Sequence, residues 1–235
     1  MKSSFRHELK YFISFRDYEI LKRKLIHILK IDDFAGEDNS YHIRSLYFDN
    51  YKNSALFEKQ SGILQRHKYR LRIYNLKKDV IKLEMKERVG QFIKKRTSLL
   101  SYKQTIEILK GNYSSLKESD DSLQRRFYID IVSQAFKPRV IVDYVREPFI
   151  YRYGNVRITF DKYLRTGLFK TSLFDKYIKT VDVIEEPKLI MEVKYDDFMP
   201  ALIRDIIQPD ASTRYAISKY VICSKFTKLS QWEDN

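Results

Sequence analysis

The sequence predicts an α+β protein built on an antiparallel eight-stranded tunnel barrel with a charged lumen and peripheral helices. Eight segments rich in β-branched and aromatic residues alternate polar and apolar side chains, and five helical patterns lie between them. In several of these strands the charged residues fall on alternate positions and therefore share one face. Strands with helices at their periphery are typical of the α+β class.

The expected strands share enrichment in β-branched and aromatic residues, and most of them alternate with a period of two, which places apolar side chains on one face. In chain order they are Phe5–Ile13, Tyr41–Phe48, Arg66–Tyr74, Val80–Arg88, Phe92–Leu100, Pro138–Arg146, Val156–Lys162 and Lys188–Tyr195.

The expected helices repeat apolar residues every three or four positions, as Leu21, Leu25 and Leu29 do in the first of them. Ser212 or Thr213 is a plausible cap for the last helix. The polar stretch Gly111–Asp121 is expected to be a loop. In chain order the helices are Phe15–Leu29, Tyr102–Leu109, Leu123–Ala135, Met199–Ile207 and Thr213–Phe226.

Composition supports a packed core, because 43% of the 235 residues are hydrophobic and 14% are aromatic. The single cysteine, Cys223, excludes an internal disulfide and a metal–thiolate cluster, and its helical segment places it in the core. No stretch reaches the roughly 18 apolar residues that span a bilayer, and the N-terminus lacks the apolar part of a signal peptide. We expect one domain over residues 1–235 in a cytoplasmic protein.

The charged faces of the expected strands are strongly basic, and Glu84 and Glu192 are among their few carboxylates. One strand of this kind is explained by a solvated sheet face. Five strands of similar composition favour a curled sheet whose charged face lines a lumen, because like charges in a row repel one another. The densest example is Arg66–Tyr74, with Arg66, Lys68, Arg70 and Arg72 opposite His67, Tyr69, Leu71 and Ile73.

A basic lumen of this kind suits an extended, highly charged anion. The net charge of +14 implies an anionic partner. Arg and Lys contact phosphate oxygens, and carboxylates among them can hold a bridging divalent cation. A glycine-rich phosphate loop is absent and the four histidines have no metal-binding spacing. Nucleic-acid binding on the outer surface is a weaker alternative, since most aromatic residues fall on the apolar faces.

Eight motifs in order resemble the VTC domain, the catalytic domain of the vacuolar transporter chaperone complex, which has stand-alone bacterial homologues. The resemblance runs from Phe5 to about Tyr220 and places the chain in the CYTH, or triphosphate tunnel metalloenzyme, superfamily. It implies a basic tunnel that binds ATP and inorganic polyphosphate or triphosphate with Mn²⁺ or Mg²⁺. The motifs are FRHELKYFIS, IRSLYFDN, KYRLRIYN, IKLEMKER, KPRVIVDYVREPF, VRITFDKYLR, LIMEVKYDDFMP and SKY.

The resemblance also implies the residues of the site. Glu192, with Glu8, is expected to bind the metal, and Arg146 and Lys194 are expected to bind substrate. Glu84 faces the same lumen as a secondary candidate. Arg6 stands where the superfamily has the first glutamate of its signature, which disfavours a two-metal hydrolase. The residues expected to position the transferred phosphate are Lys10, Arg70, Arg72, Lys86, Arg139, Arg157 and Lys219.

These implications favour a metal-dependent polyphosphate polymerase that transfers the γ-phosphate of ATP to a growing chain. A hydrolase of tripolyphosphate or nucleoside triphosphates on the same fold is one alternative, and a non-catalytic polyphosphate-binding module is another. No nucleic-acid partner is expected, and the sequence does not identify a membrane or sensor partner.

Overall fold

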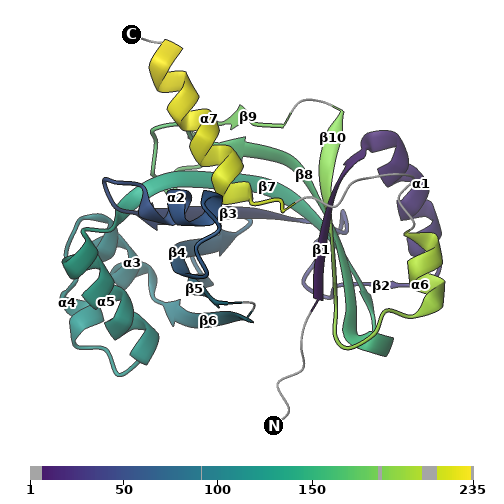
Figure 1. Cartoon of the computed structure of the whole chain (residues 1–235), viewed down its shortest axis with the longest axis horizontal. Helices are drawn as coiled ribbons and strands as arrows, with labels where there is room; N and C mark the ends of the chain where they lie inside the picture. Colours follow the sequence, from purple (N-terminus) through teal and green to yellow (C-terminus); the bar gives the residue numbers. More distant parts are fainter. Residues whose placement is uncertain (1–6, 91, 185–186, 208–215, 234–235) are drawn as a thin grey trace. The chain divides into compact units, whose positions relative to one another are not determined.

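The structure, a computed structural model, describes residues 7–90, 92–184, 187–207 and 216–233, with residues 229–233 as backbone alone. The chain divides into two compact units. Unit 1 comprises Met1–His42, Tyr144–Leu164 and Ile184–Ser218, and unit 2 comprises Ile43–Asp143, Arg165–Val183 and Lys219–Asn235. Figure 1 labels their helices and strands. The prediction of a single domain stays a prediction.

Unit 1 is an antiparallel sheet with two α-helices on its apolar face. Its strand order is β1-β10-β8-β7, and β2 pairs with β7. Leu25, Ile158 and Phe160 are fully buried in the core between the sheet and the helices. The elements are β1 (His7–Ser14), α1 (Phe15–Leu25), β2 (Lys30–Ile31), the part of β7 (Lys137–Tyr151) from Tyr144 onward, a 3₁₀ turn (Tyr153–Asn155), β8 (Val156–Thr166) up to Leu164, β10 (Lys188–Tyr195) and α6 (Ala201–Ile206).

The start of α1 is fixed by a capping box. The Ser14 hydroxyl accepts a hydrogen bond from the backbone N–H of Asp17, and the Asp17 carboxylate accepts one from the N–H of Ser14. Two amide groups that the helix leaves without partners are therefore satisfied. Tyr18, Leu21 and Leu25 then face the core.

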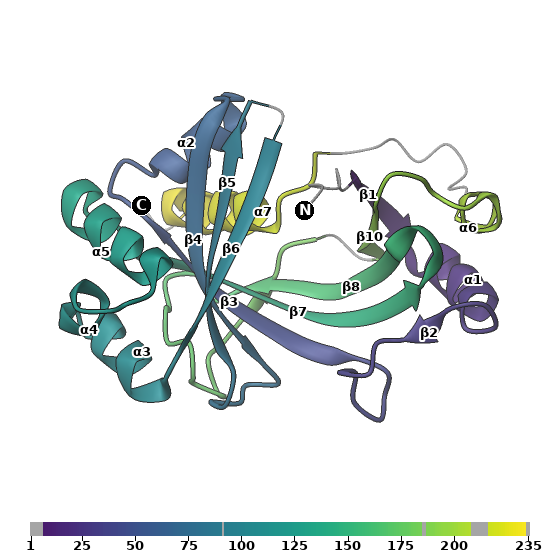
Figure 2. The ribbon, with the colours of Figure 1, turned by 90° about the horizontal axis from the view of Figure 1, so that it is seen from below.

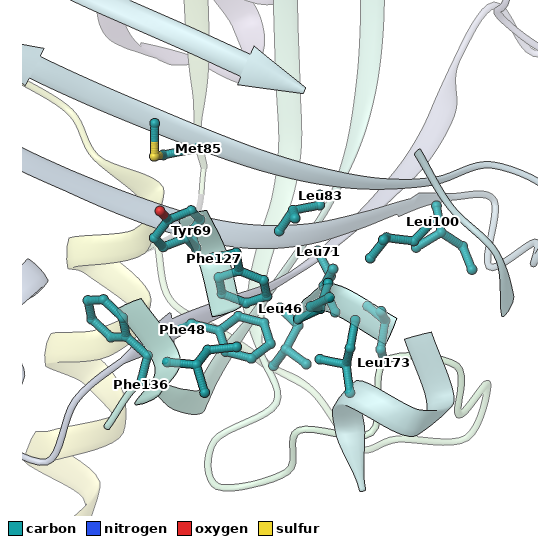
Figure 3. Packing of buried hydrophobic residues seen from close by; sticks show 14 of the residues in the cluster. Leu46, Phe48, Tyr69, Leu71, Leu83, Met85, Leu100, Phe127, Phe136 and Leu173 are labelled. Atoms are coloured by element: carbon teal, nitrogen blue, oxygen red, sulfur yellow. The ribbon is translucent and has the colours of Figure 1, made fainter. Parts of the chain in front are cut away.

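Unit 2 has strand order β7-β3-β4-β5-β6, and β9 pairs with the end of β8. Figure 3 shows the apolar face of this sheet, where Phe48, Tyr69 and Leu71 pack against Phe127. The elements are β3 (Tyr41–Asp49) from Ile43 onward, α2 (Ser54–Gln60), β4 (Gln65–Tyr74), β5 (Ile81–Val89), β6 (Phe92–Leu100), α3 (Tyr102–Leu109), α4 (Ser114–Lys117), α5 (Ser122–Gln134), β7 up to Asp143, β9 (Val181–Asp182) and α7 (Lys219–Glu233).

The structure confirms the α+β class and all eight expected strands, except that Phe5 and Arg6 of the first lie outside the described residues. Two strands of two residues each, β2 and β9, make the described sheet ten-stranded. The hydrogen-bonded path through the described residues is not closed, since it ends at β1 and at β6. Side-chain alternation reveals which face a strand presents, but it carries no information on whether the two edges of a sheet meet.

The helices differ more from expectation than the strands. α2 was not expected, and α4 lies inside the segment expected to be a loop. α1 ends at Leu25 rather than Leu29, and α7 begins at Lys219. The expected cap at Ser212 or Thr213 lies outside the described residues. Cys223 is fully buried, as expected.

Candidate functional site

The charged face of unit 1 brings four of the expected site residues together. In the sheet register, Lys10 on β1 lies opposite Glu192 on β10, and Glu8 lies opposite Lys194. The Lys10 ammonium contacts Glu8 Oε1 at 2.8 Å and Glu192 Oε2 at 3.7 Å. Lys194 contacts the other oxygen of Glu192. Cross-strand neighbours share a face, and the register therefore produces an alternating array of charges.

The two carboxylates of this array fit one mode of divalent-cation binding. Glu8 and Glu192 converge on the same ammonium group, so their oxygens lie near one another. Within the described ranges, no three His, Cys, Asp or Glu side chains gather to hold a metal by themselves. Mg²⁺ commonly binds through one or two carboxylates and completes its shell with phosphate oxygens and water. Glu8 and Glu192 fit a divalent cation that is shared with phosphate and water, and do not fit one that is bound by protein ligands alone.

Two buried donors on β8 have no acceptor among the described residues. They are Nε of Arg157 and the hydroxyl of Thr159. In the register, Arg157 lies opposite Lys194, and Thr159 lies opposite Glu192. The other side of the Arg157 guanidinium donates from Nη2 to Asp32 at 2.6 Å and to the Tyr41 hydroxyl at 3.0 Å. Buried donors of this kind are rarely left unpaired in proteins, so an ordered water or the acceptor atom of a ligand is expected to satisfy them.

Arg146 on β7 is held by a buried aspartate. Its Nε and Nη2 donate to the two carboxylate oxygens of Asp161 at 2.6 and 2.8 Å, and Asp161 is fully buried. Such a two-point contact fixes the plane of the guanidinium. Burial lowers the pKa of Lys194, and the positive charge of Arg146 acts in the same direction, whereas Glu192 opposes both.

The charged face of unit 2 carries a second cluster, centred on Glu84 of β5. The Glu84 carboxylate, 3% exposed, accepts from Arg70 Nε at 2.6 Å, lies 3.7 Å from Arg72 Nη1 and contacts Lys95. Burial alone would raise the pKa of Glu84, but the three cations hold it well below its usual range. One carboxylate therefore orients three cations and leaves the cluster with a positive excess.

Tyr47 on β3 completes this cluster. It lies opposite Arg70 in the register, and its hydroxyl accepts from Arg70 Nη1 at 2.7 Å. Burial raises the pKa of Tyr47, but Arg70 and the neighbouring cations Lys68 and Arg72 outweigh burial and lower it to about 7. The ring packs against Tyr220 of α7, with centroids 4.9 Å apart.

Asp49 anchors the start of α7 to the end of β3. Its carboxylate accepts from the Tyr220 hydroxyl at 2.5 Å and from the backbone N–H groups of Ala55 and Leu56 at 3.0 and 3.3 Å. Lys219, an expected site residue, is the first residue of α7 and is half-buried. The aspartate thus fixes the residue next to Lys219.

The remaining expected residues lie apart from these two clusters or at their margin. Lys86 on β5 is half-buried and lies opposite Lys68 and Lys95 in the register, which forms a row of three lysines on the charged face of unit 2. Arg139 on β7 is exposed. The structure thus joins Glu8, Lys10, Glu192 and Lys194 in one cluster, with Arg157 and Arg146 beside it, and joins Arg70 and Arg72 in another.

Several residues in or beside the clusters were not among the expected site residues. They include Tyr47, Lys95, Thr159 and Asp161. Tyr47 and Lys95 are joined to the cluster by cross-strand register, which a single sequence does not contain. Asp161 shares the charged face of Val156–Lys162 with Arg157, and this alternation was the available signal for it.

Comparison with known families gives a match to the VTC domain over residues 5–228. Comparison with solved structures gives similar folds. One is a candidate adenylyl cyclase from Hippeastrum with a dominant triphosphatase activity, at a TM-score of 0.56 and 12% identity over 94% of this chain and 96% of that one. Another is a candidate adenylate cyclase from Bacillus halodurans, at a TM-score of 0.50 and 14% identity over 100% of this chain and 93% of that one. Comparison with curated proteins gave no match.

The two similar structures support the fold alone at these identities. Among the described helices, none combines the length and hydropathy that crossing a bilayer requires.

Proposed function

Because the chain belongs to the VTC domain family, we propose that it transfers the γ-phosphate of ATP to a growing inorganic polyphosphate chain. The observation that carries the proposal is the pair of buried donors without acceptors, Arg157 Nε and the Thr159 hydroxyl, beside the cluster of Glu8, Lys10, Glu192 and Lys194. Phosphate oxygens are strong acceptors that can satisfy both donors.

Phosphoryl transfer requires alignment of the reacting groups and neutralisation of their charge more than covalent help from the protein. Lys10 and Lys194 supply fixed positive charge in unit 1, and Arg70 and Arg72 supply it in unit 2. Their carboxylate partners hold these cations in place before substrate arrives. The phosphate terminus of the acceptor is already ionised near neutral pH, so no general base is needed.

Mn²⁺ or Mg²⁺ is the implied cofactor, and Glu192 with Glu8 would hold it in unit 1. When bound, the ion supplies further neutralisation of phosphate oxygens. Lys10 now contacts both carboxylates, and its ammonium group could instead contact the phosphate when a metal ion is bound.

Hydrolysis of tripolyphosphate or of nucleoside triphosphates is the second candidate. It is favoured by the likeness of the fold to that of the Hippeastrum protein with its dominant triphosphatase activity. The reduced glutamate signature, with Arg6 in the first position, favours transfer over two-metal hydrolysis.

The two candidates differ in their products. We would incubate the purified chain with Mn²⁺ and either ATP or tripolyphosphate, resolve the products on a gel, and measure ADP and orthophosphate separately. Transfer predicts long-chain polyphosphate and ADP with little orthophosphate, whereas hydrolysis predicts orthophosphate from tripolyphosphate. Binding of tripolyphosphate without turnover of either substrate would rule out both and leave a binding module.

Arg157→Ala tests the observation on which the proposal rests. Because a charged hydrogen bond contributes about 1.5–3 kcal/mol, tripolyphosphate binding should weaken about ten- to a hundredfold. Arg165→Ala is the matched control, since Arg165 lies on the same strand and pairs with Asp182 at the surface. Wild-type affinity in Arg157→Ala would contradict the proposal.

A further inference from the structure

Five exposed apolar side chains gather at one end of the unit 2 sheet. They lie just before β4, at the end of β5 and at the start of β6, and Figure 2 shows these strand ends at the same end of this sheet. The N–H of Gly90 donates to the carbonyl of Leu64 at 3.0 Å, which joins the two segments. This apolar tip consists of Ile63, Leu64, Val89, Phe92 and Ile93, which are 46–64% exposed.

The apolar tip presents apolar groups on both faces of the β5–β6 hairpin. Val89 lies opposite Phe92 in the register, on the face that continues into the core. Ile93 lies opposite Arg88, on the charged face. A flat protein partner would cover one face of a hairpin. Apolar groups on both faces are buried together when the tip penetrates an apolar medium.

Basic residues surround the apolar tip. Arg66 and Arg88 lie directly opposite one another on the charged face, and Lys94 is exposed on the other face, where it lies opposite Glu87. Burial lowers the pKa of Arg66, and the neighbouring charge of Arg88 acts in the same direction. An anionic group beside these two arginines would offset the repulsion between them. The net charge of +14 also attracts the whole chain to an anionic surface.

We propose that the apolar tip inserts into the surface of an anionic lipid bilayer, with Arg66 and Arg88 at the level of the headgroups. Apolar side chains next to Lys or Arg are the combination that binds bilayer interfaces without crossing them. Lipid is favoured over a second copy of the chain because a second copy would present the same arginines and repel them. The proposal is independent of the chemistry at the charged clusters.

The test is co-sedimentation of the full chain with vesicles of phosphatidylcholine alone and of phosphatidylcholine with phosphatidylglycerol. We expect the wild type to bind the anionic vesicles and to bind the neutral ones much less. The double variant Leu64→Ser/Phe92→Ser should lose about tenfold or more in partitioning, since two exposed apolar groups no longer enter the lipid. Phe34→Ser is the matched control, because Phe34 is 88% exposed in unit 1.

Arg66→Gln/Arg88→Gln should reduce the preference for anionic over neutral vesicles. All of these side chains are exposed or half-buried, and unchanged melting temperatures would show that the variants fold. Two results would overturn the proposal. One is equal binding by wild type and Leu64→Ser/Phe92→Ser, which would make the attraction a property of the net charge. The other is a dimer in light scattering that this double variant dissociates.

Discussion

Glu84→Gln removes the carboxylate that holds three cations together in unit 2. The Glu84 carboxylate is 2.6 Å from Arg70 and 3.7 Å from Arg72 and contacts Lys95, and it is almost fully buried. Removing one partner of a buried ion pair costs about 3–5 kcal/mol. The side chains of Arg70 and Lys95 are 23% and 52% exposed, so water offsets part of the loss and the lower end of that range is expected.

A loss of about 3 kcal/mol corresponds to a fall of about 6–12 °C in melting temperature for a chain of this size. In the same variant, tripolyphosphate should bind more tightly by about tenfold, because the cations lose their internal competitor. Differential scanning fluorimetry with and without tripolyphosphate measures both effects. Glu87→Gln is the matched control, since Glu87 lies on the same strand and is half-buried on the opposite face.

The pH dependence has a definite sign. The pKa of Glu84 is depressed in the folded state, so its contribution to stability is complete above the ordinary value of 4.5 and is lost as pH falls towards the folded value. The stability difference between wild type and Glu84→Gln should therefore stay constant from about pH 8 to pH 5 and shrink below that. An unchanged melting temperature together with unchanged tripolyphosphate affinity would refute the role given to this carboxylate.

Three further predictions concern buried groups. Burial raises the pKa of Tyr47, but Arg70 and the other nearby cations outweigh burial and lower it to about 7. An ultraviolet titration should therefore show one tyrosine that ionises near pH 7 in the wild type and not in Tyr47→Phe. The stability of the wild type should rise relative to that of Tyr47→Phe from about pH 7 to 10. Arg44→Met removes the Arg44 side of its buried ion pair with Asp143 and should cost about 3–5 kcal/mol in denaturant unfolding, and adding Asp143→Leu should recover most of the loss. Burial raises the pKa of the Cys223 thiol, so a thiol reagent should modify it at the rate of unfolding and not in the native state.

Most strands were predictable because they pair an apolar face with a charged one. Where that alternation ends, the end of the strand was placed too early. Pro148 interrupts the pattern of β7, which was expected to end at Arg146 but runs to Tyr151. There β2 pairs with Phe149 and Ile150, and such pairing between distant segments leaves no trace in local alternation.

The helix α2 was missed for a different reason. Asn53, the residue before it, is in the left-handed conformation and provides no side-chain cap. The N–H groups of Ala55 and Leu56 are capped instead by Asp49, which lies several residues upstream on β3. Rules for helix starts search the adjacent residue, so a cap supplied from a strand escapes them.

Most cluster residues were predictable as members of a charged face, and their partners were not. The alternation of β4 and β5 placed Arg70, Arg72 and Glu84 on one face. The positions of Tyr47 and Lys95 depend on how β3 and β6 are aligned with those strands. Register is set by packing across the whole sheet, so the contacts of Glu84 required the structure.

The two clusters differ in their balance of charge, and this difference bears on the proposed chemistry. In unit 2, one carboxylate faces three cations, so the cluster retains a positive excess and can attract a phosphate without a metal ion. In unit 1, Glu8 and Glu192 face Lys10 and Lys194, so the charges balance. A cluster with balanced charges binds a polyphosphate weakly in the absence of a metal ion, since its carboxylates repel the phosphate as its lysines attract it. A divalent cation at the two glutamates would change that balance to a positive one, and we therefore expect the metal dependence of binding to originate in unit 1.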